Sequence, residues 1–84
     1  MVSMTEDWIA ELARCRDPER RLRLLIELRR DVAELATWLD RAWEWLDRNP
    51  GHPGAYDRET QLIVRLRLYE RASDAVVREE RAAA

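Results

Sequence analysis

A heptad of apolar positions dominates the middle of the chain. Between residues 18 and 48 these positions alternate at spacings of 3 and 4, the repeat of helices that pack along one seam. They are Leu25, Leu28, Val32, Leu35, Leu39, Ala42 and Leu46. Other apolar residues widen the seam on both flanks, so we expect a helix that packs against two or more neighbours.

Helix-start and helix-stop residues set the ends of this element. Asp17 is a good N-cap, and Pro18 suits the first helical position because the N–H that it lacks has no partner there. Two prolines and two glycines in the segment 49–56 stop the helix near Arg48 and suit a reversal of the chain. The sequence therefore predicts one long helix over 18–48, followed by a loop.

A second long helix is predicted after the loop, over about 57–80. Asp57 is its candidate N-cap, and apolar residues recur at helical spacing up to about Glu80. Its core-facing positions are Leu62, Leu66, Tyr69, Ala72, Ser73 and Val76. A short loop between two long helices predicts an antiparallel hairpin.

A short helix is predicted over about 4–15, with Ser3 or Thr5 as its N-cap. Its apolar stripe is too short to be stable without packing against another element. We therefore expect one all-α domain over residues 1–84. In it a long antiparallel helical hairpin carries the short N-terminal helix over one end.

The predicted core is thin for a chain of 84 residues. In a scaffold this small, the free energy gained by burying apolar area is roughly cancelled by the loss of conformational entropy. The four tryptophans also need more apolar surface to pack against than one hairpin supplies. We expect self-association into a dimeric or higher helical bundle, with a monomeric three-helix bundle as the alternative. The residues expected at the oligomer interface are Leu25, Leu28, Val32, Leu35, Leu39, Trp43, Leu46, Leu62, Leu66, Tyr69 and Val76.

Trp38 and Trp45 are candidates for contact with a partner. They are seven residues apart on one flank of the seam, and Trp45 lies closest to the polar face of the helix. Tryptophan and arginine are enriched at binding hot spots, although filling of the core is an equally good interpretation of these side chains. Trp45 is therefore the first choice for a contact residue.

Arg65 is the third candidate contact residue, because it falls inside the apolar arc of its helix. An arginine that faces a core must find a carboxylate or reach the edge with its charged end. The expected partners, within the chain or across a subunit interface, are Asp31, Asp40 and Asp47. An anion pocket around Arg65 is the alternative interpretation.

The segment 14–30 is basic, with seven arginines against three acidic residues, a net charge of +4. Such a segment can contact phosphates, so a small nucleic-acid-binding regulator is the alternative function. The residues that share one side of the helix for this contact are Arg20, Arg23 and Arg30. The chain as a whole has a net charge of −2, which favours a solvated face with ion pairs. The expected pairs are Glu19–Arg23 and Glu44–Arg48.

The composition argues against an enzyme, a cofactor or a metal site. Cys15 and His52 are the only cysteine and histidine, whereas a zinc site takes three or four nitrogen or sulfur ligands. Cys15 lies near a helix C-terminus, where the helix dipole disfavours a thiolate, and His52 has no evident catalytic partner. We therefore expect no catalytic, cofactor-binding or metal-ligating residues.

The sequence also suggests where the protein acts. It contains neither a run of about 20 apolar residues nor the basic and apolar regions of a signal peptide, so we expect no membrane contact. A lone cysteine suits a reducing compartment, which favours the cytoplasm. The absence of lysine and phenylalanine suggests the codon bias of a high-GC bacterium or its phage. The main expectation is a non-enzymatic, oligomerising interaction module, an accessory or regulatory protein that binds another protein.

Overall fold

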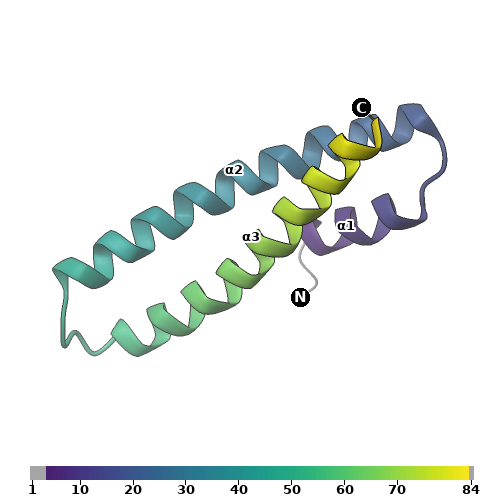
Figure 1. Ribbon diagram of the computed structural model, residues 1–84. Helices are drawn as coiled ribbons and strands as arrows, with labels where there is room; N and C mark the ends of the chain where they lie inside the picture. The colour runs from purple at the N-terminus through teal and green to yellow at the C-terminus, as the bar shows by residue number, and fades with distance from the viewer. Residues whose placement is uncertain (1–3, 84) are drawn as a thin grey trace.

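Three helices make up the protein, as the computed structural model shows for residues 4–83 (Figure 1). The helices are α1 (Met4–Arg14), α2 (Pro18–Arg48) and α3 (Ala55–Ala83). No strand occurs among residues 4–83, which confirms the all-α fold class. The candidate cap Ser3 lies outside the described residues.

The two long helices run antiparallel, and α1 lies beside the end far from their connecting loop (Figure 1). Contacts at both ends fix this arrangement. Near the loop, the guanidinium of Arg58 lies over the ring of Trp45. At the other end, Arg21 of α2 forms an ion pair with Glu79 of α3. The hairpin therefore brings the first turns of α2 next to the last turns of α3.

The start of α2 follows the helix-start residues. Pro18 occupies the first turn, and Asp17 is the N-cap with an extended backbone at φ −76° and ψ 119°. The Asp17 carbonyl accepts a hydrogen bond of 2.9 Å from the Arg21 N–H, but its carboxylate caps no N–H within residues 4–83. The cap position is therefore set by backbone geometry and by Pro18.

The start of α3 differs from the prediction, because the helix begins at Ala55 and places Asp57 in its first turn. The Gly54 N–H donates to Nδ1 of His52 at 2.9 Å, and the Ala55 N–H donates to the His52 carbonyl at 2.9 Å. The Gly54 carbonyl then accepts from the Arg58 N–H at 3.1 Å. His52 thus organises the turn before the helix, and the prediction that Asp57 is the cap is wrong.

The other predicted ends also need small corrections. α3 continues to Ala83 rather than ending near Glu80. Thr5 lies inside α1 and is buried, and its hydroxyl donates to Oδ2 of Asp31 in α2 at 2.9 Å. It is therefore a contact between helices and not the cap of α1.

The core lies where all three helices meet. Its buried cluster comprises Leu12, Leu24, Leu28, Ala72 and Ala75, and Cys15 packs against it. Leu28 is completely buried. Towards the loop the hairpin has only two helices, and the buried residues there are Ala42 and Leu62. We call this part, residues 36–69, the open half of the hairpin.

Candidate functional site

Arginines of α3 cover tryptophans of α2 on one face of the open half. The guanidinium carbon of Arg65 lies 4.0 Å from the ring centroid of Trp38, and that of Arg58 lies 5.2 Å from the centroid of Trp45. Both helices use a spacing of seven residues, so the two stacks form successive layers. We call these four residues the arginine–tryptophan face. In this face the chain's own cations partly cover Trp38 and Trp45, two of the predicted contact residues.

His52 adds to the cover of Trp45. Its ring meets Trp45 edge-on, with centroids 5.0 Å apart and planes at 75°. Trp38 and Trp45 are accordingly half-buried, whereas Trp43 is 60% exposed. Trp43, and not Trp45, therefore offers the larger free aromatic surface of α2.

Arg65 does not find the carboxylate that the sequence suggested. Within residues 4–83 the ion pairs do not include Arg65, and Asp31 instead accepts the hydroxyl of Thr5. Asp40 and Asp47 are exposed. The stack on Trp38 gives the guanidinium an electrostatic partner, so the predicted ion pair within the chain is wrong.

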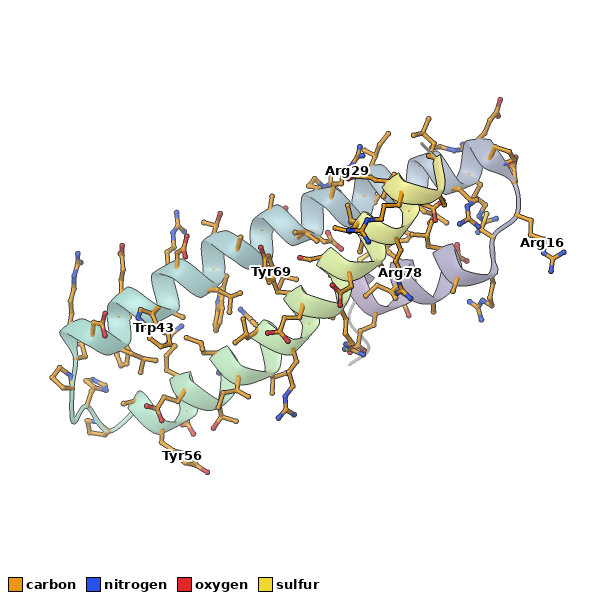
Figure 2. The ribbon with its side chains drawn as sticks, in the orientation of Figure 1. Arg16, Arg29, Trp43, Tyr56, Tyr69 and Arg78 are labelled. Carbon is orange, nitrogen blue, oxygen red and sulfur yellow. The ribbon has the colours of Figure 1, made fainter. Side chains whose placement is uncertain are left out.

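An apolar groove of about 360 Å³ lies between α2 and α3 near the loop. Its lining residues are Trp43, Leu46, Asp47, Glu59, Leu62 and Ile63. Trp43 and Ile63 are 60% and 51% exposed, and Trp43 is labelled on α2 in Figure 2. We call these six residues the apolar groove. It combines a hydrophobic surface with two carboxylates, a composition suited to a partner that is apolar and basic.

The hairpin itself covers most of the predicted interface residues. Leu25, Leu28 and Leu62 are buried. Six are half-buried: Val32, Leu35, Leu39, Leu46, Tyr69 and Val76. Trp43 and Leu66 remain exposed, at 60% and 40%. Ile63, 51% exposed, was not among the predicted interface residues, and its only signal was its place beside the core position Leu62.

Carboxylates hold most arginines of the basic segment. The ion pairs between helices are Arg20–Glu11, Arg21–Glu79, Arg29–Glu80 and Arg71–Glu6, and Arg30–Glu27 lies within α2. The predicted pairs Glu19–Arg23 and Glu44–Arg48 are not among the ion pairs of residues 4–83. Two of the three candidate phosphate contacts, Arg20 and Arg30, are therefore occupied, and Arg23 is exposed.

The Arg21–Glu79 pair is the most enclosed of these ion pairs, with side chains 32% and 16% exposed. Arg21 donates to both carboxylate oxygens of Glu79 and to the carbonyl of Cys15. The hydrogen bonds that Arg21 donates to Glu79 raise the pKa of Arg21 above its ordinary value, and the hydrogen bond that Arg20 donates to Glu11 does the same to the pKa of Arg20. Both pairs fasten the end of the hairpin that α1 covers.

Metal sites and membrane-spanning helices were also sought in residues 4–83. That part of the chain contains no group of three or more His, Cys, Asp or Glu residues placed to hold a metal ion. It also contains no helix with the length and apolar character needed to cross a membrane. In comparisons with known proteins, no family model, curated protein or solved structure matches the chain.

Proposed function

We propose that this protein is a non-enzymatic helical interaction module that self-associates through a surface that includes the apolar groove in the open half of its hairpin. The observation that carries the proposal is the apolar groove, in which Trp43 and Ile63 are more than half exposed. Tryptophan side chains are enriched among interface hot spots. Contiguous exposed apolar surface on a small protein marks an interaction site.

The shape of the molecule supports the proposal. Its radius of gyration is 15.3 Å and its extents are 50 × 26 × 14 Å, whereas a compact domain of this length has a radius of gyration of about 12 Å. Towards the loop only α2 and α3 are present, so the open half is a single layer of two helices. A second layer of helices completes the usual architecture of a helical domain, and a second copy of the chain can supply it.

The accessible surface area of the chain also supports a second copy as the partner. The chain exposes 6541 Å², and a compact monomer of 10.0 kDa exposes about 5200 Å². The excess exceeds the roughly 800 Å² that each partner buries in an interface of standard size. The chain therefore has enough surplus surface for one such interface.

The nucleic-acid alternative has less support, because carboxylates hold four of the arginines between residues 20 and 30. A phosphate partner would have to displace them, and the acidic net charge of the chain repels nucleic acid. We also propose a cytoplasmic site of action, for which the single cysteine is the support.

Neighbouring residues of α3 provide a matched test. Ile63 lines the apolar groove, whereas Val64 is 61% exposed and lies outside its lining. Sedimentation velocity at low micromolar concentration should show a dimer for the wild type and for Val64→Glu, but a monomer for Ile63→Glu. A wild-type monomer would contradict the proposal and leave the groove open to a different protein. Equal effects of both variants would place the interface elsewhere.

A further inference from the structure

A second heptad runs along α2 on the side away from α1. Its positions follow one another at spacings of 4 and 3 residues, and they are Leu22, Ile26, Arg29, Ala33, Ala36, Asp40, Trp43 and Asp47. We call these eight residues the outer seam. Seven are exposed and Ala36 is half-buried. The exposed residues of the outer seam include three large apolar ones, Leu22, Ile26 and Trp43, which are 57%, 53% and 60% exposed. A repeat of this length on a solvent-facing side indicates a place for another helix.

The contacts of α2 show that its neighbours leave the outer seam free. α1 reaches α2 through Arg20 and Asp31, which lie about half a turn around the helix from the seam at 3.6 residues per turn. α3 reaches only the edge of the seam, through the ion pair of Arg29 with Glu80 and through the groove beside Trp43. Arg29 and Trp43 are labelled towards opposite ends of α2 in Figure 2.

The charge of α2 changes sign along its length. Residues 18–30 contain five arginines and two acidic residues, a net charge of +3. Residues 31–48 contain two arginines and five acidic residues, a net charge of −3. Within α2, an antiparallel copy places each positive half over a negative half, whereas a parallel one opposes like charges. Carboxylates of α1 and α3 already pair with Arg20, Arg21 and Arg29, and of these arginines Arg29 is the one on the outer seam.

The outer seam is complementary to itself at the level of single residues. Centred between Ala33 and Ala36, an antiparallel copy pairs Ala33 with Ala36, Arg29 with Asp40, Ile26 with Trp43, and Leu22 with Asp47. The smallest side chains fall at the centre, where they allow the helices to approach closely. Opposite charges follow on both sides, and then an aliphatic residue against an aromatic one. The outermost pair, Leu22 with Asp47, is not complementary.

We propose that two copies of this chain pack α2 against α2 in antiparallel orientation, with the two-fold axis between Ala33 and Ala36. This inference rests on the proposed self-association and specifies its surface and register. The contact is isologous, so the same surface serves both copies and the assembly closes as a dimer. Ile26 of each copy reaches Trp43 of the other, at the edge of the apolar groove, which is therefore continuous with the interface.

Disulfide trapping distinguishes the registers. In a Cys15→Ser background, one chain carries Ile26→Cys and another, distinguishable by a tag, carries Trp43→Cys. The mixture should form the mixed disulfide under oxidising conditions, and neither variant alone should form one. In the proposed register two copies of residue 26 lie 17 positions apart, about 26 Å along the axis, beyond the Cα separation of about 7 Å that a disulfide spans. A disulfide of Ile26→Cys alone shows a parallel pair and overturns the proposal.

A charge swap gives a second readout that keeps Trp43. Arg29→Asp and Asp40→Arg should each weaken dimerisation at least about tenfold, because each opposes like charges twice in the dimer. The double variant should restore the wild-type affinity. Glu80→Gln is the control, since it removes the pair of Arg29 within the chain and should leave dimerisation unchanged.

The two proposals fail in different ways. A dimer by mass that gives neither the mixed disulfide nor the rescue overturns the α2 register and leaves self-association standing. A monomer by mass for the wild type overturns both.

Discussion

The guanidinium carbon of Arg65 lies 4.0 Å from the ring centroid of Trp38, and both residues line a pocket with Thr5 at the start of α1. Arg58 repeats the arrangement over Trp45 one heptad away. A third helix would normally cover such aromatic rings. In this chain long cationic side chains do so instead, with their stems against apolar surface and their charge in contact with water.

Replacing Arg65 tests the energetic value of this cover. Arg65→Ala should lower the free energy of unfolding by about 1–2 kcal/mol, through loss of the cation–π contact and of stem packing. Arg65→Lys should cost less. Arg67→Ala is the control, because Arg67 is exposed on the same helix. Urea unfolding at one fixed protein concentration measures all three, and equal effects of the two alanine variants would deny the stack a stabilising role.

The ion pair of Arg21 with Glu79 should matter more than that of its neighbour, Arg29 with Glu80. The Glu79 side chain is 16% exposed and bidentate, whereas Glu80 is 47% exposed. Glu79→Gln should therefore lower the Tm more than Glu80→Gln does, because exposed pairs contribute little. A larger loss for Glu80→Gln would contradict this ranking.

The pH dependence of this pair follows from the raised pKa of Arg21. A base whose pKa is raised by folding contributes stability that is fully present below its unfolded pKa and is lost as the pH rises through the folded value. Both values lie far above neutrality for arginine. The Tm difference between the wild type and Glu79→Gln should thus be constant from neutral to mildly alkaline pH. A difference that shrinks in this range would point to another group.

Thr5 tests how α1 is attached. Its buried hydroxyl donates to Asp31, and Thr5→Val leaves this carboxylate without that donor, at a cost of about 1–3 kcal/mol. Hydrogen exchange in α1 should accelerate. Thr60→Val is the control, since the exposed hydroxyl of Thr60 bonds to the Tyr56 carbonyl within its own helix. Unchanged exchange in the Thr5 variant would show that apolar packing alone holds α1.

Ser73 offers a substitution that should stabilise the protein. Its Oγ is buried without a hydrogen-bond partner among residues 4–83. Ser73→Ala removes the desolvated hydroxyl and introduces a better helix former, for a gain of about 1 kcal/mol in the free energy of unfolding. Thermal unfolding measures it. A loss of stability would show that the hydroxyl has a partner in the assembled protein.

The apolar periodicity made the fold predictable, because Leu25, Leu28 and Ala42 of the first heptad and Leu62 of the second long helix show the helical period and are buried as expected. The start of α3 was not predictable, since capping rules favour Asp57 whereas the turn is organised by the His52 side chain. Arg65 was placed correctly in the apolar arc, but sequence spacing cannot distinguish a carboxylate partner from a tryptophan ring. The outer seam could not be recognised from the sequence, because its residues count as an exposed face only once the side of α2 that packs against α1 is known.

The central claim is self-association, and the absolute mass in solution tests it most directly. Light scattering after size exclusion, at low micromolar concentration, should give about twice the chain mass of 10.0 kDa. A mass of one chain across the accessible concentrations would contradict the account, because the apolar groove and the outer seam would then both face water.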